Sequence, residues 1–371
     1  AAVYAATRGN HAAINRVLYP PSANRAACTY LGNYMLRTVN AIPEGFLDAR
    51  ASELFGLLGG PTLINLSGLK REPMFVSVLQ HGNEDSGLLA IQQLLKNFQG
   101  KILPRDLVIF VGNVEAAEAN LRRLEDQPDY NRVWPDCTEQ NDLTRMMQDI
   151  YDEMKVRNVF LSVDIHNNTG YNPHYACVNK IDPKFFYLAS KFSEICVYFT
   201  EPTCVQSVAF SQLCPAVTLE CGKAGDAEGV DRALSFLHDC MLLEDWSDHS
   251  NIGKIDVFHT VAVVKVPEEV SFGFQHPQAE IDFIADLDHL NFRDLKKGTL
   301  LASIRGDEPV PVIVTEVESD AVVTRKYFTC ENHQLKLNKP MILAMLTLDS
   351  TVIRQDCLCY IMEHYPIPDF W

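Results

Sequence analysis

The stretch Phe75-Val76-Ser77-Val78-Leu79-Gln80-His81-Gly82-Asn83-Glu84 changes from apolar to polar along its length. Its first half is short and rich in β-branched side chains, which predicts a buried strand. Residues 86–98, which follow, have helical periodicity. His81 and Glu84 are therefore expected on the turn between a strand and a helix, with Gly82 allowing a sharp bend. Open α/β sheets bind their ligands at such turns, beyond the carboxyl ends of the strands.

Strands and helices alternate from about residue 61 to residue 252. The predicted strands are 74–80, 106–111, 158–165, 196–199 and 216–220, and the predicted helices are 86–98, 114–124, 141–156, 183–193 and 227–243. This alternation indicates the α/β class, with a mostly parallel or mixed sheet flanked by helices.

The two ends of the chain do not show this alternation of strands and helices. Residues 1–60 are expected to form a helical N-terminal extension, with helices at 23–39 and 47–58. Residues 253–371 are expected to form an all-β C-terminal domain, a small barrel or sandwich, with strands at 257–266, 299–304, 310–317, 321–328 and 341–348. The region 277–290 is the one candidate helix within that β-rich part.

Composition excludes several classes of partner. The 371 residues suffice for two domains with full cores, and the formal net charge of −16 argues against nucleic acid and anionic membranes as partners. No apolar run is long enough to span a bilayer, and the first residues lack the features of a signal peptide. The 11 cysteines have no paired spacing, which favours reduced thiols and a cytoplasmic location. The oligomeric state stays open, a homo-oligomer included.

Polar side chains follow several of the predicted strands. His81 and Glu84 follow the first, Asp164-Ile165-His166-Asn167-Asn168 ends another, and Glu220-Cys221-Gly222 ends a third. A single histidine at a strand end is usually structural, and a single glutamate there commonly caps a helix. Two histidines and two glutamates at one edge of one sheet favour a metal site.

The residue types suggest how the metal site would work. His81, Glu84 and His166 supply the two nitrogens and one carboxylate of a catalytic zinc, with one Zn²⁺ per chain and a fourth position open to water. Zinc makes that water a nucleophile near neutral pH. Glu220 would act as general base and then general acid. Asp164, two residues before His166, is interpreted either as a partner of an imidazole N–H or as a partner of a Lys or Arg.

These segments resemble the signature of the succinylglutamate desuccinylase/aspartoacylase family, which belongs to the zinc carboxypeptidase-like superfamily. The resemblance covers residues from about 60 to 250, and the β-rich C-terminal region also fits it. Asp129-Tyr130-Asn131-Arg132-Val133-Trp134-Pro135 is similar to another motif of that family. The resemblance implies that Asn131 and Arg132 grip the carboxylate of the substrate, as the guanidinium fork allows. It also implies an upstream arginine, Arg123 or its neighbour Arg122.

The leading hypothesis is therefore a zinc-dependent hydrolase that cleaves the amide bond of an N-acyl amino acid, a small-molecule substrate. One alternative is a zinc carboxypeptidase that acts on short peptides. A second is a non-catalytic metal- or carbohydrate-binding protein, which the β-rich C-terminal region keeps open. Glu220 argues against pure binding, because a binding site needs no unligated carboxylate beside its ligands. The sequence leaves the acyl group and the amino acid undefined.

Overall fold

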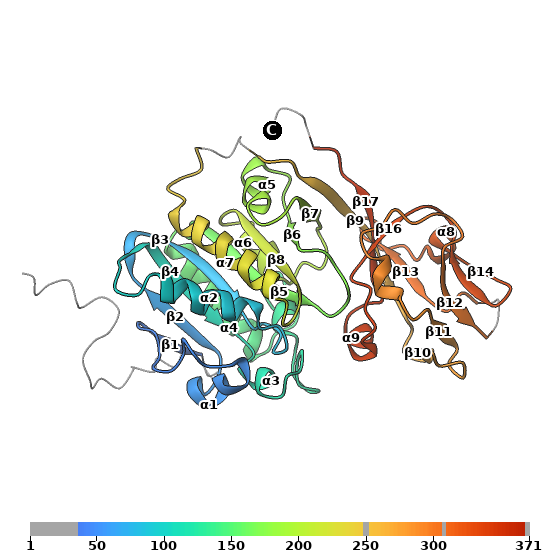
Figure 1. Cartoon of the computed structure of the whole chain (residues 1–371), viewed down its shortest axis with the longest axis horizontal. Coiled ribbons are helices and arrows are strands. Elements are labelled where there is room, and N and C mark those ends of the chain that lie inside the picture. The colour runs from blue at the N-terminus through green and yellow to red at the C-terminus, as the bar shows by residue number, and fades with distance from the viewer. Residues whose placement is uncertain (1–35, 248–251, 306–308, 368–371) are drawn as a thin grey trace, which may run out of the picture.

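The structure is a computed structural model that describes residues 36–247, 252–305 and 309–367. Figure 1 shows a large central sheet, with α2 and α7 lying side by side across one of its faces, and a second β-rich region at the C-terminal end of the chain. The predicted α/β class, with a large sheet flanked by helices, is confirmed.

The central sheet has twelve strands in the order β1-β2-β4-β3-β5-β8-β6-β7-β9-β17-β16, with β13 paired to β9. Neighbours β3, β4, β5 and β8 are parallel, whereas β2 and β6 run antiparallel to their partners β4 and β8. The strands are β1 (Arg37–Val39), β2 (Thr62–Leu66), β3 (Gly68–Val78), β4 (Leu103–Val111), β5 (Leu161–Asn168), β6 (Tyr175–Val178), β7 (Ile195–Tyr198), β8 (Ala216–Lys223), β9 (Asp256–Lys265), β13 (Ile313–Glu316), β16 (Ile342–Ala344) and β17 (Cys359–His364).

The helices cover the sheet because their apolar faces pack onto it. The α-helices are α1 (Leu54–Leu58), α2 (Ser86–Asn97), α3 (Val114–Glu118), α4 (Asp142–Val156), α5 (Pro183–Ser190), α6 (Gln206–Phe210), α7 (Ala227–Leu242), α8 (Thr324–Tyr327) and α9 (Ser350–Gln355), and the 3-10 helices are η1 (Ala51–Glu53), η2 (Tyr130–Arg132) and η3 (Leu287–Leu290). α2 approaches β3 and β5 closely, since a Cβ on Gly87 would lie 2.9 Å from Cβ of Ile165.

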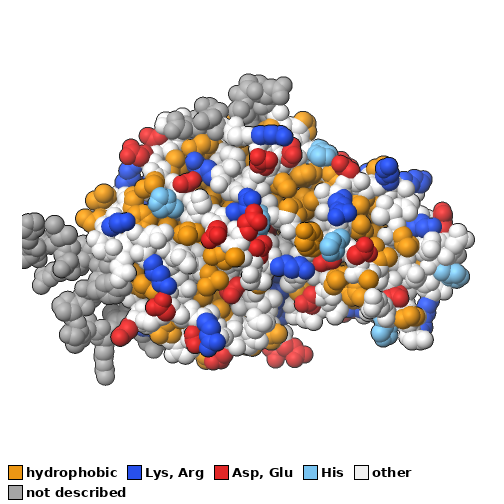
Figure 2. Space-filling model, viewed as in Figure 1, with side chains coloured by type: hydrophobic (Ala, Val, Ile, Leu, Met, Phe, Trp, Pro, Cys, Tyr) orange, Lys and Arg blue, Asp and Glu red, His pale blue; other side chains and the backbone are white. Residues whose placement is uncertain are grey.

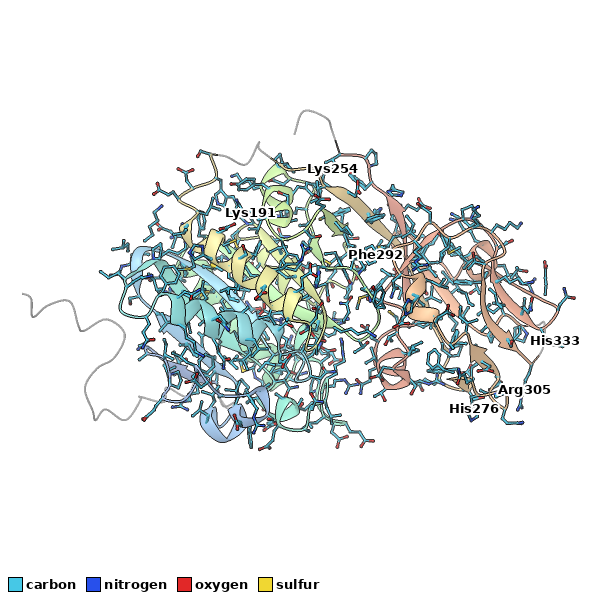
Figure 3. All side chains as sticks on the ribbon, viewed as in Figure 1. Lys191, Lys254, His276, Phe292, Arg305 and His333 are labelled. Atoms are coloured by element: carbon cyan, nitrogen blue, oxygen red, sulfur yellow. The ribbon has the colours of Figure 1, made fainter. Side chains whose placement is uncertain are left out.

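The second sheet has five strands in the order β10-β11-β12-β15-β14, which are β10 (Phe272–Phe274), β11 (Ile281–Phe283), β12 (Leu300–Ile304), β15 (Gln334–Leu337) and β14 (Phe328–Glu331). The division of the chain at residue 252 stays a prediction, and β9, β13, β16 and β17 from beyond it join the central sheet. Figure 3 places Phe292 between the central sheet and the C-terminal β-rich region. Its ring centroid lies 4.8 Å from that of Tyr175 in β6.

Several sequence expectations differ from the structure. The expected helix 23–39 lies mostly outside the described residues, and its end is β1. The helix expected at 114–124 ends at Glu118, because the backbone turns at Asn120, where φ is 54°. Residues 277–290 contain β11 and η3 rather than one long helix, and half of the strand expected at 321–328 is α8. In both cases tertiary packing overrides weak local propensity.

Figure 2 shows basic and acidic side chains interspersed over the face in view. Among the described helices there is none whose length and apolarity would allow it to cross a membrane.

Candidate active site

The turn after β3 places His81 by an unusual backbone path. Leu79 has a φ of 56°, a conformation rarely adopted by a residue with a side chain. Gly82 allows the bend without adopting a positive φ. A Cβ there would instead lie 2.2 Å from the backbone N of Ala117, so Gly82 lets the turn pack directly against α3.

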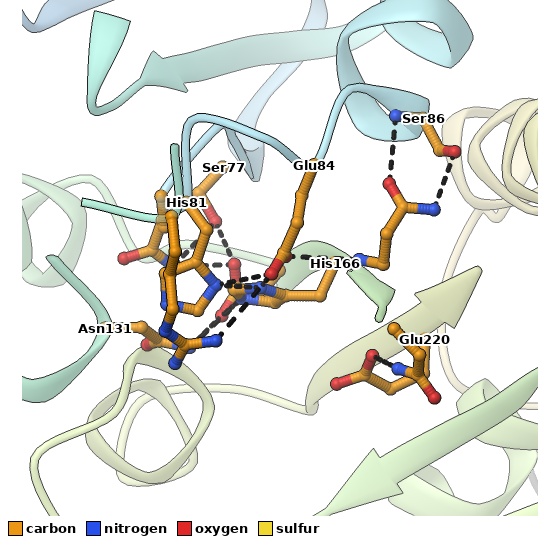
Figure 4. A network of polar contacts seen from close by, with 12 residues as sticks. Ser77, His81, Glu84, Ser86, Asn131, His166 and Glu220 are labelled. Carbon is orange, nitrogen blue, oxygen red and sulfur yellow. Dashed lines mark hydrogen bonds and ion pairs between the residues drawn. The ribbon is translucent and has the colours of Figure 1, made fainter. Parts of the chain in front are cut away.

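His81, Glu84 and His166 converge on one point, as Figure 4 shows. The Glu84 carboxylate lies 2.8 Å from His81 Nδ1 through Oε1 and 2.7 Å from His166 Nδ1 through Oε2. The two Nδ1 atoms are 3.2 Å apart. All three side chains are buried, and their ligand atoms lie within 4.8 Å of one another.

The outer nitrogen of each imidazole faces a second carboxylate. His81 Nε2 lies 3.1 Å from Asp129 Oδ1, and His166 Nε2 lies 2.9 Å from Asp164 Oδ2. Of the two interpretations of Asp164, the structure therefore bears out the imidazole partner. Carboxylates in this position fix the tautomer and the orientation of metal-binding histidines.

The donor set fits a divalent cation. If each Nε2 carries the proton that it shares with Asp129 or Asp164, both Nδ1 atoms present lone pairs toward the Glu84 carboxylate. Converging lone pairs and an anion repel each other unless a cation lies between them. Two nitrogens and one carboxylate suit zinc.

Glu220 lies beside this cluster without belonging to it. In the parallel pairing of β5 and β8, Glu220 is the register partner of His166. Its carboxylate accepts a hydrogen bond from the amide of Asn168 (Figure 4). Burial is the main reason that the pKa of Glu220 is raised to about 8. A buried carboxyl with a raised pKa, next to a candidate metal site, can accept and return a proton.

Asn131 contacts the Asp164–His166 pair. Its amide Nδ2 lies 3.0 Å from both Asp164 Oδ2 and His166 Nε2, while its Oδ1 accepts the N–H of Gln206. Asn131 therefore positions Asp164 by a hydrogen bond and lies against the His166 ring. It lines the cavity, but its amide is already engaged by protein groups.

The upstream arginine that reaches the site is Arg122, not Arg123. The Arg123 guanidinium turns away and donates to backbone carbonyls, among them that of Gln127 at 2.9 Å. Arg122 instead lines the cavity, with its Nη2 3.0 Å from Asp129 Oδ2 and its Nη1 3.8 Å from Glu84 Oε1. The assignment of Arg123 to substrate binding loses its support, because its Nη1 donates within its own loop.

Arg132 lines the same cavity, but its fork faces a carboxylate of the protein. Arg132 Nη2 lies 3.2 Å from both oxygens of Asp356, and Nη1 donates to the backbone carbonyl of Asn131 at 2.8 Å. Arg122 approaches the same carboxylate at 3.7 Å. Asp356 lies between α9 and β17, in a part of the chain where the sequence offered no site motif.

The cavity that these residues share has a volume of about 110 Å³. Its lining holds polar and charged side chains, namely His81, Glu84, His166, Glu220, Arg122, Arg132, Glu201 and Asp356, together with apolar ones. The apolar walls include side chains from both the α/β region and the C-terminal region, namely Val197, Phe199, Val205, Met345, Tyr360 and Met362. The site is thus a buried polar cluster that shares its cavity with apolar side chains.

Residues 73–235 match the sequence profile of the succinylglutamate desuccinylase/aspartoacylase catalytic domain. The fold is similar to that of a succinylglutamate desuccinylase from Chromobacterium violaceum (15% identity over 83% of this chain and 89% of that chain, TM-score 0.53). It is also similar to a succinylglutamate desuccinylase/aspartoacylase from Rhodobacter sphaeroides (14%, 81% and 88%, TM-score 0.54) and to murine aminoacylase 3 (15%, 81% and 97%, TM-score 0.52). No match was found among curated proteins. The resemblance inferred from the sequence motifs is confirmed.

Proposed function

Because residues 73–235 match the profile of the succinylglutamate desuccinylase/aspartoacylase catalytic domain, we propose that the protein is a zinc-dependent hydrolase that cleaves the amide bond of N-acyl amino acids. The observation that carries this proposal is the convergence of His81, Glu84 and His166, with the outer nitrogen of each imidazole held by a carboxylate. Zinc held by these three residues would polarise a substrate carbonyl and supply an activated water.

Each surrounding residue then has a defined task. Asp129 and Asp164 hold the two imidazoles with Nδ1 directed inward. Glu220 takes a proton from the attacking water and returns it to the leaving amine nitrogen, because an amine leaves far more readily when protonated. Burial favours the protonated form of Glu220, which helps this carboxyl to hold the proton between these two events.

Arg122 is proposed to stabilise the negative charge that develops on the amide oxygen. Its guanidinium lies 3.8 Å from Glu84 Oε1, and the side chain is 10% exposed. Its Nε is buried without a hydrogen-bond partner. A hydrogen bond from a buried donor to the reacting carbonyl becomes stronger as the oxygen gains negative charge. Such a bond stabilises the transition state more than the ground state and so lowers the barrier.

The experiment begins with protein stripped of metal by a chelator and then reloaded with zinc. Amine release is measured with fluorescamine over a panel of N-acetyl-, N-succinyl- and longer N-acyl amino acids. We expect no turnover without metal and recovery at one zinc per chain. Full activity of the metal-free protein, or zinc binding with no hydrolysis across the panel, would reject the proposal.

Unmodified dipeptides and tripeptides are included in the same panel. A carboxypeptidase would release the last residue of these peptides, whereas the proposed deacylase requires the acyl group.

A further inference from the structure

Asp356 occupies the cationic end of the cavity. Both of its oxygens are 3.2 Å from Arg132 Nη2, and Oδ2 is 3.7 Å from Arg122 Nη2. Asp356 lines the cavity together with both arginines, and its side chain is 18% exposed. A carboxylate of the protein therefore lies where the guanidinium groups would otherwise receive a carboxylate from the substrate.

The two arginines are already surrounded by carboxylates of the protein. Arg122 and Arg132 bring two positive charges, and Asp129, Asp356 and Glu84 bring three negative charges at distances of 3.0 to 3.8 Å. A further anion entering this end would approach Asp356 at close range in a poorly solvated space, which is unfavourable. A neutral polar group would meet no such repulsion.

Asp356 is anchored on both sides in the chain. Its own N–H donates to the carbonyl of Val352, and Leu358 N–H donates to the carbonyl of Val264 as β17 joins the central sheet. Arg354 donates to the carbonyl of Pro267 at 2.7 Å and stacks over Phe272. Because these contacts fix the backbone around it, Asp356 is a permanent part of the wall and not a flap that a substrate pushes aside.

The remaining walls also suit an uncharged group. Val197, Phe199, Val205 and Met362 line the cavity, and their side chains offer contact area with no charge and no hydrogen-bonding group. Binding here is favoured by burial of apolar surface. The apolar walls cannot compensate for burying an additional carboxylate. The two arginines cannot do so either, because they already face carboxylates of the protein.

Resting on the proposed function, we infer that Asp356 is a specificity-determining residue. It directs the hydrolase toward N-acyl amino acids whose α-carboxyl is blocked as an amide or ester, and it excludes those with a free α-carboxylate. In this assignment Arg132 holds Asp356 in place, and the substrate presents a neutral carbonyl to this end of the cavity.

The test uses matched substrate pairs that differ only in this group. N-acetyl-L-leucine is compared with N-acetyl-L-leucinamide, and N-succinyl-L-leucine with N-succinyl-L-leucinamide, on the zinc-loaded full chain. We expect kcat/KM of the wild-type protein to favour the amides by roughly tenfold or more, the usual scale for an uncompensated charge in a polar site. In Asp356→Asn, which keeps the shape and removes the charge, the ratio of kcat/KM for the free acid to kcat/KM for the amide should rise roughly tenfold or more.

Asp142→Asn is the matched control, since it removes the same charge from an exposed Asp–Arg pair on α4 outside the cavity. The ratio of the two substrates within one preparation is independent of the fraction of folded protein. A wild-type preference for the free acids overturns this inference alone, as does an equal gain of both substrates in Asp356→Asn. If no member of any pair or of the wider panel is cleaved, the proposed function fails and the inference fails with it.

Discussion

Replacing Asp129 is expected to weaken zinc binding although Asp129 is not a ligand. Its Oδ1 lies 3.1 Å from His81 Nε2 and accepts the N–H of Asn131 at 2.8 Å, and its Oδ2 accepts from Arg122 at 3.0 Å. The hydrogen bond to Nε2 keeps His81 Nδ1 free of a proton and directed at Glu84. Loss of such a partner typically lowers metal affinity by about 10- to 100-fold.

The structure ranks two variants within that range. Asp129→Asn keeps the carbonyl oxygen that faces His81, but its new NH₂ group faces the donor of Arg122. We therefore expect the low end, about tenfold or 1.4 kcal/mol. Asp129→Ala removes every acceptor and frees the His81 ring to change tautomer, so we expect the high end, about 100-fold or 2.7 kcal/mol.

The assay is the zinc dissociation constant, measured in competition with a chromogenic chelator for the wild type, both variants and the control Asp142→Asn. Thermal unfolding of each variant shows whether it still folds. The metal-free proteins are compared, because bound zinc would stabilise the native state according to its affinity. If Asp129→Ala bound zinc within twofold of the wild type, or if the control weakened binding equally, the argument from the imidazole partner would be refuted.

Three further changes test other parts of the site. Glu220→Gln should keep zinc stoichiometry but lose about 10²- to 10⁴-fold in kcat, since the amide cannot carry the proton, and near-normal turnover would reassign the base. Gly82→Ala should lower the free energy of unfolding of the metal-free protein by about 3 kcal/mol, because its Cβ would meet the backbone of Ala117 at 2.2 Å; denaturant unfolding measures this, and an unchanged midpoint contradicts it. Burial opposes charge on Asp356, yet Arg132 and Arg122 hold its pKa below the ordinary 3.8. Its stabilising contribution is therefore present above about pH 4 and is lost as the pH falls through the lower, folded-state pKa, so Asp356→Asn should lose less stability than the wild type on acidification, and parallel pH profiles of unfolding would contradict this.

Much of the α/β region could be predicted because its signals are local. The apolar run that ends at Val78 and the amphipathic segments that became α2, α4 and α7 each carry their own periodicity. The C-terminal region was less predictable. The β-branched residues at 321–328 resemble a strand, yet half of this segment forms α8, whose packing against β13 and β14 outweighs propensity.

The candidate site divides in the same way. His81, Glu84 and His166 could be grouped because parallel strands bring their carboxyl ends to one edge of a sheet, so position along the strand predicts proximity. Arg122 and Arg123 could not be told apart, since both follow the short helix α3 in an irregular segment where no periodicity predicts side-chain direction. Asp356, 224 residues from Arg132 in the sequence, offered no signal at all.

By itself, the sequence determined the class of fold, the family motifs and the three candidate metal ligands, because each depends on residue type and on spacing within one strand or turn. Only the tertiary structure decided that Asp129 and Asp164 hold the imidazoles, that Arg122 enters the cavity, and that Asp356 faces Arg132. These pairings depend on the register of distant strands and on the paths of loops, which are set by packing of the whole chain and not by any local pattern.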